Sequence, residues 1–411
     1  MLKILLSTLC IVISLSTRIF AQISKVDSSE MITLRIDPKS IRGATVSQTF
    51  DEVNFIPLET TKESLFGSIT KIELAGDCFV IYDRDTRAVL VFGKDGKFKA
   101  KLNGSKIKED KSEQTGSDVS GFSLKHEINR SLIRIYSGKY YYYFDLNGKL
   151  VNRVIAIDET YDWGIRFKDG TEVIDSYDRN GDRYNLALIK DTSIVEAYFP
   201  YTNERFKDDY FSVGINPISD SKIPNEMYFV NYFDYNIYRI TPKKLFLSYR
   251  IVFPSEISFP SDFTSNPVYV NKRHEFFKQQ PNKISEISNV YKIGNKLFFK
   301  VYSLANKQRR NGFIYNLTTR SSVSIKDLEP DQLSMFLPVT DMAGFTDFDY
   351  KGFHLCDGTY LYTSYSSLAM FTYKEQSVNK NPNYTAAMKN YFKTQDRKSN
   401  PVIIQLKPKK G

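Results

Sequence analysis

A short unit recurs along the chain: an apolar strand, a tight polar turn and a second strand. The first strands of these units are expected at Val89–Phe92, Tyr141–Phe144, Leu186–Ile189, Ile237–Ile240, Phe313–Tyr315 and Ala369–Tyr373. The first two turns contain Asp-Gly or Asn-Gly, which are strong hairpin signals because glycine tolerates positive φ. The strand ends lie 45 to 58 residues apart, with one longer interval of 75 residues. This period indicates a radial array of repeated sheets.

A strand pair precedes the hairpin in several units. The clearest pairs are Ile69–Leu74 with Phe79–Tyr82, Val290–Ile293 with Leu297–Tyr302, and Phe353–Leu355 with Tyr360–Tyr365. Four strands in each of six units predict an all-β fold, a six-bladed β-propeller with about four antiparallel strands per blade. Val53–Leu58 and Val402–Leu406 are the expected ring-closing strands, and how they divide that task is left open.

Interruptions of the repeat define the expected domain plan. The propeller is predicted over 46–408, after an N-terminal segment at 22–45. The longest interval holds a Pro- and Ser-rich insertion at 254–283. Residues 375–400 are expected to form a short helical excursion in the last blade, because the apolar residues of 383–394 have helix-like spacing. A second helical signal covers Ile325–Phe336, with a possible start at Asp327.

The N-terminus has the layout of a secretory signal peptide. Lys3 precedes a mostly apolar run from Ile4 to Leu15, and Ala21 offers a small residue for cleavage. We therefore predict a signal peptide at 1–21 and an exported, periplasmic or extracellular mature protein. Cys10 lies inside the apolar run and not at the cleavage point, which argues against a lipid anchor. No later segment approaches the roughly 18 apolar residues of a membrane span.

The net charge and the cysteine content bear on nucleic-acid binding and on disulfide formation. Loss of Lys3 and Arg18 with the signal peptide leaves 55 basic residues against 47 acidic ones, a net charge of +8. The basic residues are spread along the chain, which favours a solvated surface over a nucleic-acid site. Cys78 and Cys356 remain after cleavage, in the first and last blades. Two separate buried thiols are favoured, although an oxidising compartment would permit a bridge.

The opening and closing stretches resemble a known family. Val53–Thr61, Gly67–Ile72 and Val80–Asp83 open the repeats, and Asn400–Ile404 closes the chain behind a short helix. Together they resemble a bacterial family of exported six-bladed β-propellers of unassigned function, related to NHL-repeat propellers, over about residues 45–408. The resemblance implies the fold and export and supplies no catalytic residues. Asn103–Gly121 departs from the family, because it is a Lys- and Ser-rich loop where relatives have a Gly-rich one.

Four residues are candidates for a ligand site at the mouth of the central channel. Trp163, the only tryptophan, lies beside Asp162 at the start of the third unit. His126 and His354 are expected near innermost strands of the second and last blades, while His274 falls in the insertion. None of the three has paired-histidine spacing, so we predict no metal site and no cofactor.

Other constellations favour structural roles. Asp175–Asp182 is interpreted as a polar hairpin turn, because it lacks the downstream Glu of a calcium-binding EF-hand loop. Asp208-Asp209 and Asp83-Arg84-Asp85 are interpreted as solvated loop residues. The rings of Tyr140–Tyr143 alternate between faces of a strand, as core residues or as a sugar-stacking platform.

No catalytic signature is present. The sequence lacks a Gly-x-Ser-x-Gly elbow, a His-Glu-x-x-His motif and a Gly-rich phosphate loop. The favoured hypothesis is therefore a binding or scaffold module for a glycan, a peptide or a cell-envelope protein, rather than an enzyme. The alternative is a propeller lyase or glycan-acting hydrolase with a metal or carboxylates in the channel.

Overall fold

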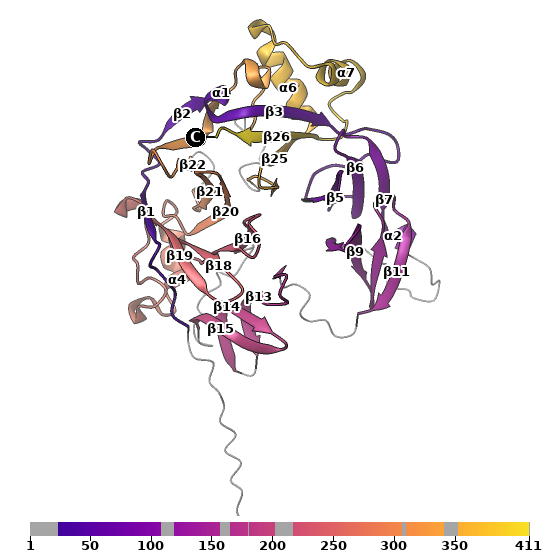
Figure 1. Ribbon diagram of the computed structural model, residues 1–411. Helices are drawn as coiled ribbons and strands as arrows, with labels where there is room; N and C mark the ends of the chain where they lie inside the picture. The colour runs from indigo at the N-terminus through magenta and orange to yellow at the C-terminus, as the bar shows by residue number, and fades with distance from the viewer. Residues whose placement is uncertain are drawn as a thin grey trace, which may run out of the picture.

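Six sheets, four with four strands and two with five, stand around a central axis (Figure 1). The computed structural model describes residues 24–107, 119–156, 165–179, 181–201, 217–305, 310–340 and 352–410. The predicted six-bladed β-propeller is confirmed. The predicted signal peptide, Asp208-Asp209 and most of the loop Asn103–Gly121 lie outside the described residues.

The first three blades follow one another along the chain, and each is written here from its innermost to its outermost strand. Blade 1 has β4 (Lys71–Ala75), β5 (Cys78–Asp83), β6 (Ala88–Gly93) and β7 (Phe98–Leu102). Blade 2 has β8 (Ser123–His126), β9 (Ser131–Ser137), β10 (Tyr140–Phe144) and β11 (Leu150–Ile155). Blade 3 has β12 (Ile165–Arg166), β13 (Glu172–Arg179), β14 (Asp182–Lys190) and β15 (Ser193–Pro200).

The remaining blades include strands from the N-terminal segment. Blade 4 has β16 (Ile218–Asp220), β17 (Met227–Val230), β18 (Asn236–Ile240), β19 (Leu245–Val252) and an added outer strand, β1 (Ile32–Arg35). Blade 5 has β20 (Glu286–Ile293), β21 (Lys296–Tyr302), β22 (Gly312–Asn316), β23 (Ser322–Glu329) and an added outer strand, β2 (Arg42–Thr45). Blade 6 has β24 (Leu355–Cys356), β25 (Leu361–Tyr365), β26 (Val402–Pro408) and β3 (Phe50–Pro57).

The two ends of the chain close the ring. β3 is the outermost strand of blade 6 and pairs antiparallel with β26, with Val53 opposite Leu406. The two expected closing strands therefore form neighbouring strands of one sheet. Gly96, in a turn of blade 1, lies directly against Pro57 at the end of β3. A Cβ at Gly96 (φ +82°) would lie only 2.2 Å from the carbonyl oxygen of Pro57. Only glycine fits that position.

The prediction of a strand at Ala369–Tyr373 is wrong. These residues lie in α6 (Ser367–Ser377), and the third strand of blade 6 is β26. Ser366 caps the helix by accepting a hydrogen bond from the Ala369 N–H (3.3 Å). Ala369, Met370 and Tyr373 are buried together, which is a helical spacing. The excursion continues through η5 (Val378–Lys380) and α7 (Ala386–Thr394), where the sequence predicted a helix.

The other short helices are few in the described part of the chain. They are α1 (Val46–Thr49), α2 (Gly104–Ile107), α4 (Arg273–Gln279), η1 (Ser255–Ile257), η2 (Pro267–Tyr269) and η4 (Gln332–Ser334). The prediction of a helix over Ile325–Phe336 is wrong, because its first five residues belong to β23 and only three later residues form a short helix, η4. In the 254–283 insertion, Phe259, Phe263 and Phe276 pack with Phe233 of blade 4 in a small core of their own.

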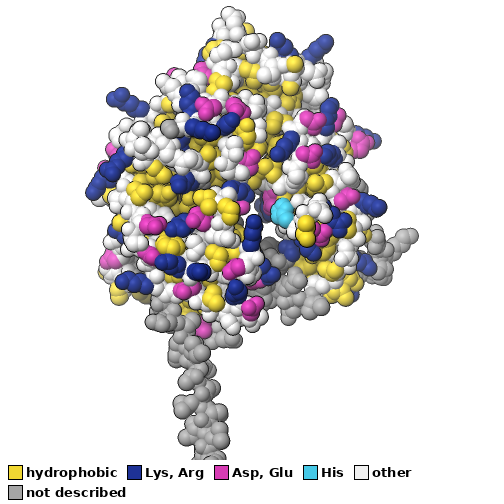
Figure 2. All heavy atoms as spheres, viewed as in Figure 1, with side chains coloured by type: hydrophobic (Ala, Val, Ile, Leu, Met, Phe, Trp, Pro, Cys, Tyr) yellow, Lys and Arg dark blue, Asp and Glu magenta, His cyan; other side chains and the backbone are white. Residues whose placement is uncertain are grey.

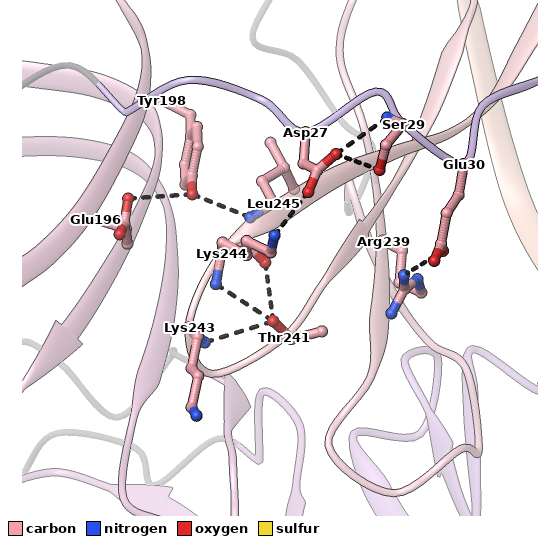
Figure 3. A network of polar contacts seen from close by, with 10 residues as sticks. All are labelled: Asp27, Ser29, Glu30, Glu196, Tyr198, Arg239, Thr241, Lys243, Lys244 and Leu245. Carbon is pink, nitrogen blue, oxygen red and sulfur yellow. Dashed lines mark hydrogen bonds and ion pairs between the residues drawn. The ribbon is translucent and has the colours of Figure 1, made fainter.

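An extended strap, residues 24–45, follows the outer edges of blades 3, 4 and 5. Ser24 donates its N–H to the carbonyl oxygen of Ala197 on β15 (3.0 Å). β1 then pairs parallel with β19, and β2 pairs parallel with β23. Figure 3 shows the Asp27 carboxylate between Ser29 and Lys244, whose Nζ donates to Asp27 Oδ2 (2.6 Å). The bond from Lys244 holds the pKa of Asp27 far below its ordinary value.

Candidate functional site

The two histidines predicted for the channel mouth lie on or beside the innermost strands of blades 2 and 6. His126 is exposed and ends β8, and its Nδ1 lies 2.9 Å from Ser131 Oγ. His354 comes just before β24, and its Nε2 lies 2.8 Å from Ser364 Oγ. Asp162 and Trp163 lie outside the described residues.

On the innermost strand of blade 1, Lys71 makes two polar contacts. Lys71 Nζ lies 2.5 Å from Glu73 Oε1 and donates to the Phe122 carbonyl (3.0 Å), which joins blades 1 and 2. Figure 2 shows a hollow at the centre of this face, with Lys, Arg and His side chains near its rim. Among the described residues, no three His, Cys, Asp or Glu side chains converge into a metal site.

The Ser364–His354 pair has the heavy-atom distance of a nucleophile and its base. Ser364 is nevertheless buried, at 3% exposure, inside the wall of blade 6. A substrate therefore has no access to this hydroxyl in the conformation described. The geometry is that of a hydrogen bond that fixes the ring of His354 against β25.

Asp83 corrects one sequence interpretation. It was expected to be solvated, yet its side chain is fully buried. Its carboxylate accepts hydrogen bonds from Thr86 Oγ1 (2.7 Å) and from the N–H groups of Thr86, Asp85, Ser68 and Gly67 (3.2–3.3 Å). Asp83 therefore organises a turn and is not an acid or base awaiting substrate. Asp175–Asp182 does form a β13–β14 hairpin, as interpreted from the sequence.

The junction of blades 2 and 3 differs from the others. Five clusters of buried apolar residues each draw on two neighbouring blades, and the sixth comes from blade 3 alone. Within the described ranges, no apolar cluster joins blade 2 to blade 3. In Figure 1 these blades are the pair labelled β9 and β11 on one side and β13 to β15 on the other.

The face of blade 2 toward this junction carries tyrosines and cations. Ile133, Ile135, Tyr142 and Phe144 pack against blade 1. Because side chains alternate along a strand, the intervening residues point to the other face. We call this set the tyrosine face: Lys125, Arg134, Tyr136, Tyr141 and Tyr143. The cross-strand pairs Tyr141–Tyr136 and Tyr143–Arg134 place their side chains side by side.

The geometry of the tyrosine face suits an anionic, partly apolar ligand. The Tyr136 and Tyr141 rings lie 5.3 Å apart between centroids. Arg134 lies over the Tyr141 ring and Lys125 over the Tyr143 ring, each 4.9 Å from the centroid. Tyr136 remains 49% exposed. Ring faces attract apolar C–H surface, and the cations supply hydrogen-bond donors to an anion.

Blade 2 is also electropositive. Over the described residues 119–156 there are six basic residues, at 125, 130, 134, 139, 149 and 153, and two acidic ones, Glu127 and Asp145. The net charge is therefore +4. Glu127 is engaged by Arg130 (2.8 Å), and Asp145 accepts the Asn147 and Lys149 N–H groups within a turn. Sequence reasoning noted Tyr140–Tyr143 but missed Tyr136 and Arg134, because the pairing of β9 with β10 was not known.

The comparisons with known proteins support the fold and leave the activity open. No curated protein matches the chain. A crystal structure of a protein described as exported, from Bacteroides fragilis, is similar over 92% of this chain and 99% of its own, with 14% identity and a TM-score of 0.60. A member of the DUF4221 family from Bacteroides vulgatus covers 88% of this chain and 98% of its own, with 8% identity and a TM-score of 0.39.

The first of these structures shares the propeller fold, and at that identity it shows nothing further. No helix among the described residues is long and apolar enough to span a membrane. The family comparison covers most of the repeats, from within β1 to near the end of β26. Since residues 33–407 match the family described as a domain of unknown function, DUF4934, the chain belongs to that family.

Proposed function

We propose that this protein is an exported binding module and that its tyrosine face holds an acidic glycan. The observation that carries the proposal is the Tyr136–Tyr141 ring pair beside Arg134, in which Tyr136 is 49% exposed. The pair lies on the kind of blade face that the other blades use for apolar packing. Stacking on a tyrosine suits the C–H face of a sugar ring. Arg134 and Lys125 suit its carboxylate groups.

The proposal includes the cellular setting. The mature chain would begin after Ala21, without a lipid anchor, in the periplasm or outside the cell. The signal-like N-terminus and the exported relative support this setting. Kinship with NHL-repeat propellers belongs to the same proposal and is supported by the repeated hairpins alone.

Binding of defined oligosaccharides to the mature protein tests the proposal. The probes are a fluorescently labelled oligomer of galacturonic acid and the matched oligomer of galactose, which lacks the carboxylates. We expect the acidic probe to bind and the neutral one to bind at least about tenfold more weakly, since charge-assisted hydrogen bonds contribute about 1.5–3 kcal/mol each. Equal binding of both probes, or no binding of either, would refute an acidic-glycan site.

Variants locate the site. Tyr136→Ala is expected to weaken binding about tenfold, because aromatic contacts contribute roughly 0.5–1.5 kcal/mol beyond the buried area. Tyr302→Ala is the matched control, since Tyr302 is 40% exposed on blade 5, far from the tyrosine face. His126→Ala, His354→Ala, Asp162→Ala and Trp163→Ala test the channel mouth. If these four weaken binding and Tyr136→Ala does not, the ligand binds at the channel and our placement is wrong.

A further inference from the structure

The outer edges of the blades are covered unequally. β1 and β2 pair with the outermost strands of blades 4 and 5, and α7 packs on β3 of blade 6. Ser24 hydrogen-bonds the middle of β15 in blade 3. β7 of blade 1 is short, is followed directly by α2, and carries Lys99 and Lys101. Lysine on an edge strand discourages pairing with another chain.

The outer edge of β11 in blade 2 has none of these covers among the described residues. Five of its six residues are exposed. Three of the exposed side chains are apolar: Val151, Val154 and Ile155, the last at 59%. An exposed edge strand with apolar side chains is a ready template for another strand.

The hydrogen-bond pattern shows which backbone groups point outward. Ala156 donates its N–H to the Lys139 carbonyl on the β10 side (2.8 Å). Hydrogen-bonded and non-hydrogen-bonded pairs alternate in an antiparallel ladder. Val154, opposite Tyr141, is therefore bonded to β10, whereas Ile155 presents its N–H and C=O groups to the outside. Arg153 presents its C=O group outward, while its N–H donates to Oδ1 of the neighbouring Asn152 (2.8 Å).

The charge along this edge selects the partner. Lys149 precedes β11, Arg153 lies within it and Lys139 faces its end, while β11 itself carries no acidic residue. A second copy of the chain would bring the same positive charges together. A strand that carries carboxylates would be attracted instead.

We propose that the outer edge of β11 is a strand-addition site for an extended segment of another protein in which apolar and acidic residues alternate. The chain already uses this mode of pairing, since its own β1 and β2 add to the edges of blades 4 and 5. Backbone hydrogen bonds would supply affinity and the side chains selectivity. The site is independent of the acidic-glycan site, which uses the tyrosine face and not the strand edge.

Binding of synthetic peptides to the full mature protein tests this proposal. The probe is a fluorescein-labelled nonapeptide in which valine alternates with glutamate. One control peptide has lysine for glutamate. The other keeps the glutamates but has alternate backbone nitrogens methylated, which removes donors without changing the charge. We expect the first peptide to bind and both controls to bind at least about tenfold more weakly, the loss of a few backbone or charged hydrogen bonds.

Two variants of Ile155 place the peptide on β11. Ile155→Pro removes an outward N–H and leaves the bonds to β10 intact, and Ile155→Asp adds a like charge against the peptide. Each is expected to lose about tenfold in affinity while keeping the wild-type far-ultraviolet circular dichroism. Val268→Asp, at a 60% exposed residue of the insertion, should bind as wild type.

Three outcomes would overturn the proposal. Equal binding of the methylated peptide would show that charge alone attracts it. Unchanged binding by both Ile155 variants would place the peptide elsewhere. Sedimentation showing a dimer that Ile155→Asp dissociates would assign the edge to a second copy. Loss of glycan binding by Tyr136→Ala bears only on the tyrosine face, so the two proposals fail separately.

Discussion

Asn400 and Phe66, 334 positions apart in the chain, are joined by a buried hydrogen bond in which the Phe66 N–H donates to Asn400 Oδ1 (3.0 Å). Asn400 Nδ2 donates in turn to the carbonyl oxygens of Glu59 (2.8 Å) and Ser64 (3.0 Å). One fully buried amide therefore satisfies three backbone groups of the segment that leads from the last blade to the first.

Replacing Asn400 with alanine should destabilise the protein strongly. The three backbone groups would lose their partners, and each buried unsatisfied group costs about 1–3 kcal/mol, so we expect a loss of about 3 kcal/mol or more. Guanidinium denaturation measures the free energy of unfolding. Asn390→Ala, at an exposed position of α7, is the control and should change it little. Wild-type stability of Asn400→Ala would show that this contact does not hold the closure.

Glu286 makes stability depend on pH. Burial at the start of β20 raises the pKa of its carboxyl from 4.5 to about 8, with nearby Lys300 acting in the opposite direction. Its Oε1 has no hydrogen-bond partner among the described residues. Because the folded-state pKa is raised, the folded protein holds a proton that the unfolded chain releases. The contribution of Glu286 to stability is therefore most favourable below about pH 4.5 and is lost as the pH rises to about 8.

Glu286→Gln should remove this dependence. We expect the variant to be more stable than wild type by roughly 4 kcal/mol at pH 8 and similar to it at pH 4, as the linkage between pKa and stability requires for a rise from 4.5 to about 8. Urea denaturation at the two pH values measures the difference. Glu256→Gln, at an exposed glutamate, should show no such contrast. Equal destabilisation of the Glu286→Gln variant at both pH values would contradict the assignment.

Cys78 and Cys356 should react as two free thiols. Both are buried and unpaired with each other. Cys78 packs between blades 1 and 2 and Cys356 between blades 5 and 6, so neighbouring blades do not bring their sulfur atoms together. Burial raises the pKa of Cys356 to about 11 and also raises that of Cys78.

The thiols should therefore react slowly with a disulfide reagent at pH 8 in the folded protein and fully after denaturation without reductant. Thiol titration of the mature protein measures both rates. Appearance of the thiols only after reduction would mean that the blades had joined them.

Removing the strap up to Ile36 should destabilise blade 4. Leu34 is fully buried, and its loss exposes the cluster between blades 4 and 5. Loss of one such side chain costs roughly 1.5–3 kcal/mol in buried apolar area alone. Calorimetry should show a lower melting temperature, and hydrogen exchange should rise in β19. Asp27→Asn tests the Lys244 contact without exposing apolar surface and should have a smaller effect. An unchanged exchange rate in β19 after truncation would contradict a stabilising strap.

Local sequence signals predicted the hairpins of most blades. They failed where tertiary packing determines whether a segment forms a strand or a helix. Asp95-Gly96 and Asn147-Gly148 mark hairpins by their own backbone preferences, so they could be found from the sequence. Ala369–Tyr373 has apolar residues at both strand-like and helical spacing. Only the cap at Ser366 and the packing against Tyr365 select the helix.

The candidate site was harder to predict than the fold. The tyrosine face depends on which residue of β9 lies opposite which residue of β10, and a shift of one residue would turn Tyr136 and Arg134 to the other side. His126 and His354 each lie near an innermost strand, as expected.

The strap and β3 both pair with strands that are synthesised much later. Ile32 pairs with Tyr249, and Phe55 pairs with Ile404, so residues made early wait for partners made late. Such distant pairings are slow to form. The ring can be completed only once β26 has left the ribosome and crossed any membrane in its path. Until then the edge strands of several blades are unpaired. The incomplete chain therefore needs a chaperone or rapid export to avoid aggregation.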